Sequence, residues 1–158
     1  GYVGGPTMAV IADKCPNIIV TVLDINSKRI HDWNDTNLSN LPVYEPGLDE
    51  IIKRCRGVNL FFSTNLEKEI SLADMIFLSV NTPTKTKGIG AGQASDLKWI
   101  EASARQVAIY AKGKTIVVEK STLPVKTAQT IKQILEASDG KNSIQESNNQ
   151  FFILSNLI

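Results

Sequence analysis

The first residues of the chain, GYVGGPT, have a spacing that suits phosphate binding. Gly1 and Gly4 form a G-x-x-G pattern, and a helical sequence follows Pro6. Glycines let the backbone approach a pyrophosphate, and a helix N-terminus offers unpaired N–H groups and positive potential. The pattern is the second half of the G-x-G-x-x-G fingerprint of dinucleotide-binding folds. By itself, this half-motif is better read as an ordinary turn before a helix.

Asp24 strengthens the dinucleotide interpretation. It ends the apolar run IIVTVLD, about 20 residues after Gly1, where dinucleotide folds place an acid that binds the ribose 2′-hydroxyl. A carboxylate there also repels a 2′-phosphate, which favours NAD over NADP. The alternative is a helix N-cap for the segment SKRIHDW, a role for which the neighbouring Asn and Ser compete. Arg29 either flanks the adenosine or pairs with Asp24 or Asp32, and we favour cofactor contact.

Two further predicted strand ends carry small hydroxyl residues. The segment SVNTPT follows the predicted strand Met75–Val80, and EKSTLP follows Thr115–Glu119. Ligands of open α/β sheets bind beyond the carboxyl ends of the strands, and turns of this composition present free N–H groups. Each segment alone is an ordinary strand-to-helix turn. Their position at the same predicted edge as Asp24 favours a binding role.

An alternation of strands and helices would position these segments. The short apolar runs are IIVTVLD, NLFFST, MIFLSV, TIVVEKS and FFILSN. Ser95 or Asp96 can cap a helix that Gly113 ends, and Asn65 and Pro46 lie at the starts of two others. Near-continuous apolar strands suit a parallel sheet covered on both faces. We therefore predict an α/β fold with a Rossmann-like, doubly wound parallel sheet.

Composition limits the function classes. The chain has 158 residues, of which 42% are hydrophobic, and a formal net charge of +1. These values suit one globular domain and provide no strong field for nucleic acid or a membrane surface. Cys15 and Cys55, the only cysteines, lack metal-ligand spacing, so we expect reduced thiols, no metal and a cytoplasmic location. His31, the only histidine, lacks the neighbours of a catalytic triad.

Six motifs, in order along the chain, resemble one enzyme family. They are GYVGGPT, VTVLDIN, LPVYEPGL, NLFFSTN, SVNTPTKT and EKSTLPV. Together they are similar to the UDP-glucose 6-dehydrogenases, and the long segment after NTPT resembles the eukaryotic branch. The resemblance implies an NAD-binding domain over residues 1–158, with NAD as the cofactor.

The resemblance also implies roles for individual residues. For the pyrophosphate region these are Gly1, Tyr2, Val3 and Gly4; for the adenosine half, Asp24 and Arg29; and for the nicotinamide side, Val80, Asn81, Thr82, Pro83, Thr84, Ser121 and Leu123. Thr122 matches a threonine that in this family helps to position the catalytic water.

Both ends of the chain depart from the family pattern. The strand expected before Gly1 is absent, and Leu157 stands where the family has proline. The family's acid/base glutamate, lysine, asparagine and nucleophilic cysteine would lie beyond Ile158, and neither Cys15 nor Cys55 matches that cysteine. We therefore expect a fragment, incomplete at both ends and inactive by itself, that lacks the first central strand of its sheet.

By resemblance, the parent enzyme oxidises the C6 alcohol of UDP-glucose to the carboxylate through hydride transfers and covalent intermediates on a cysteine. UDP-glucose would bind mainly through parts outside this chain, in a homo-oligomer, with no nucleic-acid or membrane partner. The alternatives are a UDP-N-acetylhexosamine or GDP-mannose dehydrogenase, or a non-catalytic nucleotide-binding module.

Overall fold

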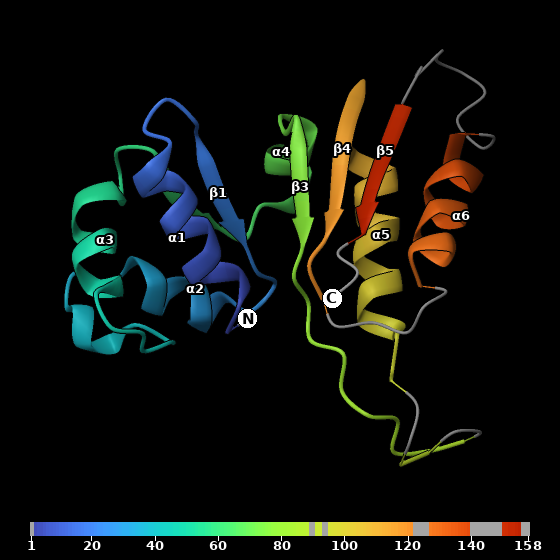
Figure 1. The fold of residues 1–158 in the computed structure, drawn as a ribbon, viewed down its shortest axis with the longest axis horizontal. Helices are drawn as coiled ribbons and strands as arrows, with labels where there is room; N and C mark the ends of the chain where they lie inside the picture. The colour runs from blue at the N-terminus through green and yellow to red at the C-terminus, as the bar shows by residue number, and fades with distance from the viewer. Residues whose placement is uncertain (1, 89–90, 93–94, 122–126, 140–149, 156–158) are drawn as a thin grey trace. The chain divides into compact units, whose positions relative to one another are not determined.

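The computed structural model describes residues 2–88, 91–92, 95–121, 127–139 and 150–155 (Figure 1). The chain separates into two compact units, Gly1–Glu69 and Ile70–Ile158. Each unit has its own parallel sheet and its own helices. The predicted α/β class is therefore confirmed.

The first unit contains a two-stranded sheet. Its elements are α1 (Gly4–Lys14), β1 (Val20–Leu23), α2 (Ser27–Asn34), the short 3₁₀ helix η1 (Leu38–Asn40), α3 (Leu48–Cys55) and β2 (Leu60–Ser63), followed by α4 (Leu66–Ser71). β1 and β2 are parallel, with Val20 opposite Leu60 and Leu23 opposite Ser63. α1 packs against β1 and α3, and α2 packs against β2.

The core of the first unit lies between this sheet and its helices. Its buried residues are Ala9, Ala12, Val20, Ile30, Trp33, Val43, Leu48, Ile52, Cys55, Leu60 and Phe62. The buried Asn59 joins two elements of this core, because its Nδ2 donates to Ala12 O at 2.8 Å and to Ile18 O at 3.2 Å. This side chain holds the end of α1 at the start of β1.

The second unit contains a three-stranded parallel sheet in the order β3-β4-β5. Its elements are β3 (Met75–Leu78), α5 (Lys98–Tyr110), β4 (Lys114–Glu119), α6 (Thr127–Asp139) and β5 (Gln150–Ser155). α5 and α6 pack against each other, α5 against β3 and α6 against β5 (Figure 1). Along β4 the alternate residues Thr115, Val117 and Glu119 are buried, as expected for a strand with one covered face.

The predicted strands and helices are present among the described residues, with differences at their ends. β3 ends at Leu78, two residues before the predicted end at Val80. α3 begins two residues after Pro46, because Gly47 takes the N-cap position with a φ of 79°. α2 ends at Asn34, one residue after the predicted helical segment SKRIHDW. The N-cap of α5 is Leu97, without a side-chain cap, and the preceding Asp96 accepts a hydrogen bond from the Lys98 backbone nitrogen at 3.1 Å.

The sheet order has one feature that bears on the predicted central strand. Among the described residues, β1 pairs only with β2, and β3 pairs only with β4. Both strands therefore have one edge without a strand partner in this part of the chain. The expectation of a missing first central strand stays a prediction.

Candidate functional site

The N-terminus of α1 carries the glycine-rich turn. Tyr2 and Val3 are 81% and 57% exposed, and the helix begins at Gly4. Val3 is the N-cap residue, without a side-chain cap, and the first turn contains no acidic residue. Its carbonyl oxygen accepts from the Thr7 backbone nitrogen at 3.1 Å and from the Thr7 hydroxyl at 2.7 Å. A helix N-terminus of this kind suits an anion, while Gly1 lies outside the described residues.

Gly5 has a packing role that sequence reasoning missed. It is buried, and a Cβ atom at this position would lie 2.4 Å from Cζ2 of Trp33. Atoms do not approach this closely, so a larger residue requires Trp33 to move. The only signal in the sequence was the second glycine of the Gly4-Gly5 doublet.

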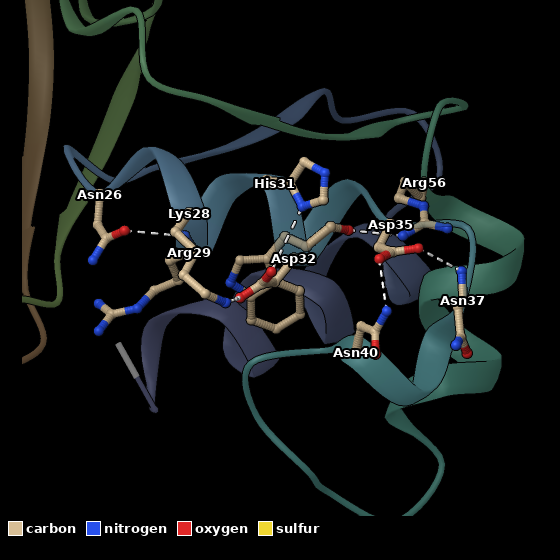
Figure 2. Close-up of polar contacts among 10 residues, drawn as sticks. Asn26, Lys28, Arg29, His31, Asp32, Asp35, Asn37, Asn40 and Arg56 are labelled. Carbon is tan, nitrogen blue, oxygen red and sulfur yellow. Dashed lines mark hydrogen bonds and ion pairs between the residues drawn. The ribbon is translucent and has the colours of Figure 1, made fainter.

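Asp24 follows β1 and makes two contacts with the start of α2. Its Oδ1 accepts from the Asn26 backbone nitrogen at 2.9 Å, and its Oδ2 lies 2.9 Å from Arg29 Nη1. Asn26, not Asp24, is the N-cap, and its side chain accepts from the Arg29 backbone nitrogen at 3.1 Å (Figure 2). The Asp24–Arg29 ion pair leaves 17% and 44% of these side chains exposed. The pairing proposed as an alternative for Arg29 is thus present, and cofactor contact stays a prediction.

The remaining polar contacts of α2 stabilise the chain around it (Figure 2). Asp35 accepts from Asn40 Nδ2 at 2.7 Å and from the Asn37 backbone nitrogen at 2.8 Å, and these bonds lower the pKa of the Asp35 carboxyl. His31 is exposed and lies 3.6 Å from Asp32. We find no arrangement for proton transfer in this group.

The predicted nicotinamide-side residues of the second unit follow β3 and β4. Ser121 Oγ lies 2.8 Å from the carbonyl oxygen of Val80 and 3.3 Å from that of Leu78. The backbone nitrogen of Lys120 also donates to Leu78 O, at 3.0 Å. The structure thus brings Ser121 and Val80 together at two neighbouring strand ends.

The segment after Val80 carries the other predicted residues. Val80 and Thr82 are half-buried, and Asn81, Pro83 and Thr84 are exposed. Thr84 forms an antiparallel bridge with Ser95, and the backbone nitrogen of Asp96 donates to Pro83 O at 2.6 Å. The chain therefore returns to this point before α5 begins. Thr122 and Leu123 lie outside the described residues.

Glu119, the last residue of β4, was not singled out by its sequence context. Its residue surface is only 6% exposed, and burial raises the pKa of its carboxyl. The sequence signal that could have identified Glu119 is the position of an acidic residue at the end of an apolar strand. It lies two residues before Ser121, next to the predicted nicotinamide-side segment.

The residues that the structure describes contain neither a candidate metal site nor a candidate membrane span. Within them, no group of three His, Cys, Asp or Glu residues could hold a metal ion. None of the helices in the same ranges is long and apolar enough to cross a membrane.

Comparison with known proteins identifies the family. Residues 1–156 match the NAD binding domain of the UDP-glucose/GDP-mannose dehydrogenase family. The chain belongs to this family. The uncapped N-terminus of α1 and the Asp24 carboxylate are the donor and acceptor groups that a pyrophosphate and a ribose require, so these residues fit the NAD that such a domain binds.

Individual relatives of this NAD-binding domain agree with that assignment. It is 59% identical to UDP-glucose 6-dehydrogenase 3 of Oryza sativa subsp. japonica over 152 residues, which are 96% of this chain and 31% of that protein. It is 58% identical to UDP-glucose 6-dehydrogenase of Drosophila melanogaster over 138 residues, 87% of this chain and 28% of the relative. The structure of a UDP-glucose dehydrogenase from Pyrobaculum islandicum covers 99% of this chain with a TM-score of 0.76 and 25% identity, over 33% of its own length. The domain thus spans about a third of the length of these relatives.

Proposed function

We propose that this domain serves an enzyme that oxidises UDP-glucose to UDP-glucuronate with NAD. The observation that carries the proposal is the 59% identity to a UDP-glucose 6-dehydrogenase over 96% of the chain. The 152 matched residues span both groups of predicted site residues, those near Asp24 and those near Ser121. Solved relatives named for other nucleotide sugars are 20–27% identical to the chain, among them a GDP-mannose dehydrogenase at 21%.

In this proposal the first unit binds the adenosine half of NAD. Gly1 through Gly4 and the N-terminus of α1 hold the pyrophosphate, because uncapped N–H groups and the helix dipole favour an anion. Asp24 accepts hydrogen bonds from the ribose hydroxyls, and Arg29 lies beside the adenosine. Support comes from the exposed parts of the Asp24 and Arg29 side chains, which remain accessible after they pair.

The second unit binds the nicotinamide side. We assign this role to the backbone of Val80 through Thr84 and to Ser121 and Leu123, and we assign to Thr122 the positioning of the catalytic water. The hydrogen bond from Ser121 to Val80 supports this assignment, since it orders both segments at the strand ends where ligands of such sheets bind. When bound, NAD supplies the acceptor for the hydride from the sugar.

The remaining parts of the proposal concern the whole enzyme. UDP-glucose binds mainly through regions outside this chain, and the enzyme is a homo-oligomer in the cytoplasm. The free state of Cys15 and Cys55 is consistent with a reducing compartment. We propose no nucleic-acid or membrane partner, since the net charge of +1 provides no strong field for either.

The test is a substrate comparison with the full-length enzyme that contains this domain. NADH formation is followed with UDP-glucose, UDP-N-acetylglucosamine, UDP-N-acetylgalactosamine and GDP-mannose. We expect turnover with UDP-glucose and background rates with the others. Turnover with another sugar would identify a different member of the family. NAD binding without turnover on any of them would indicate a non-catalytic nucleotide-binding module.

A further inference from the structure

We infer that Trp33 is a positioning residue for the adenosine half of NAD. In this inference it sets the spacing between the N-terminus of α1 and the Asp24–Arg29 pair. It rests on the proposed function, in which these two features bind the pyrophosphate and the ribose. All of the residues that carry it belong to the first unit.

The first contact of Trp33 is with the glycine-rich turn. A Cβ atom on Gly5 would lie 2.4, 2.9 and 3.2 Å from the indole atoms Cζ2, Cη2 and Cε2. The edge of the six-membered ring therefore lies directly against the first turn of α1. This turn can lie so close to α2 only because residue 5 has no side chain.

The second contact holds Trp33 from the side of the sheet. Its ring stacks on Phe62 of β2, with the centroids 4.9 Å apart and the planes inclined by 7°. Its carbonyl oxygen accepts from Arg56 Nη1 at 2.7 Å, and the next residue, Asn34, donates from Nδ2 to Phe62 O at 3.3 Å. With 2% of its surface exposed, Trp33 has no free space into which to move.

The helix α2 connects Trp33 to the Asp24–Arg29 pair. Arg29 lies four residues before Trp33, which is about one helical turn. Asn26 caps the same helix and donates its backbone N–H to Asp24 Oδ1. A shift of Trp33 away from α1 would therefore move the helix that orients Arg29 and, through Asn26, the carboxylate of Asp24.

A double-mutant cycle on the full-length enzyme tests this inference. Gly5→Ala places a methyl group against the indole, and Trp33→Phe removes the ring atoms that the methyl group would meet. Binding of NAD and of ADP-ribose, which lacks nicotinamide, is measured by titration calorimetry on protein shown to be folded. We expect Gly5→Ala to weaken both ligands about tenfold, less than the roughly hundredfold cost of a 1 Å misplacement in a catalytic site. The KM for NAD should rise, and kcat at saturating NAD should stay nearly unchanged.

The double variant provides the decisive comparison. Gly5→Ala with Trp33→Phe should bind ADP-ribose more tightly than Gly5→Ala alone, because the methyl group then occupies space that the indole has left. Ile52→Val is the stability control, since Ile52 is buried on α3, which carries no predicted cofactor residue. It should lower the melting temperature without changing affinity. If Gly5→Ala does not fold, the comparison is made between Trp33→Phe and the double variant, which should then bind equally well or better.

The outcomes separate this inference from the proposed function. A wild-type enzyme that binds neither NAD nor ADP-ribose would overturn both. A wild-type enzyme that binds both, together with a folded Gly5→Ala variant of unchanged affinity, would overturn only the role of Trp33. The role of Trp33 would also be overturned if Gly5→Ala and Ile52→Val lowered affinity equally at an equal loss of stability. In that case Trp33 would act on folding alone.

Discussion

The Ser121 hydroxyl donates a hydrogen bond to the carbonyl oxygen of Val80 over 2.8 Å. Ser121 follows β4 and Val80 follows β3, two strands whose pairing ends where Leu78 lies opposite Glu119. The side chain therefore continues the connection between the strands after their backbone pairing has stopped. It also fixes the direction of both segments that we assign to the nicotinamide side.

Removing this hydroxyl should affect stability and cofactor binding together. We expect Ser121→Ala to lower the free energy of unfolding by about 0.5–1.5 kcal/mol, the usual net value of one hydrogen bond. The KM for NAD should rise, because the segment after Val80 loses its contact. Ser121→Thr retains the hydroxyl and is the control. Equal kinetic effects of the two substitutions would show that the hydrogen bond has no part in binding.

Asp24 should determine the choice of cofactor. In the full-length enzyme, Asp24→Ala should weaken NAD by about 1.5–3 kcal/mol, the range for hydrogen bonds to a charged group. NADP should be disfavoured less than in the wild type, because the repulsive carboxylate is gone and Arg29 loses its partner. Asp32→Ala is a matched control, since Asp32 pairs with Lys28 on the same helix. Unchanged NAD affinity in a titration of Asp24→Ala would remove Asp24 from the site.

Thr122 should affect turnover more than cofactor binding. The residue lies outside the described part of the chain, and its role comes from the family resemblance. Thr122→Val is nearly isosteric and removes only the hydroxyl that we assign to the catalytic water. It should lower kcat more than it raises the KM for NAD. Steady-state kinetics that show only poorer NAD binding would make Thr122 a cofactor contact and nothing more.

Glu119 should make stability fall as pH rises. Burial raises the pKa of this carboxyl above its ordinary value of 4.5, so the folded state favours the protonated form. The protonated carboxyl contributes fully to the free energy of unfolding below pH 4.5. This contribution is lost as pH rises through the higher pKa of the folded state. Glu119→Gln removes this dependence, so the variant should gain melting temperature over wild type at neutral pH and lose that advantage in acid. A difference that does not change with pH would show that Glu119 has no shifted titration.

The sequence predicted the elements better than the contacts between them. The apolar runs identified the five strands of the described residues, and the position of Asp24 directly after β1 followed from its place at the end of IIVTVLD. Asn26 competes with Asp24 for the same cap, and only the backbone geometry shows that Asn26 takes it. Local composition could not decide between them, because both residue types are good N-caps.

Contacts between distant residues were beyond sequence reasoning for a physical reason. Gly5 and Trp33 are brought together by the packing of α1 against α2, and no periodicity within either helix encodes that distance. The hydrogen bond between Ser121 and Val80 depends in the same way on the pairing of β3 with β4. The stacking of Trp33 on Phe62 likewise joins α2 to β2 over a long distance in the sequence.

Residues 1–158 expressed alone should fold poorly and aggregate. Among the described residues, β1 and β3 each have a strand partner on one side only. Their other edges present unpaired N–H and C=O groups, which recruit strands from other molecules. We expect a broad, concentration-dependent melt by circular dichroism and rising light scattering, with no NADH formation from UDP-glucose. Adding a short β-strand sequence before Gly1, taken from a relative, should sharpen the melt and reduce scattering, because it can pair with the open edge of β1. A matched extension of equal length rich in Gly and Ser should leave the melt and the scattering unchanged.

A sharp melt with tight NAD binding by the unextended chain would contradict the expectation about folding. NADH above background would contradict the expectation about activity.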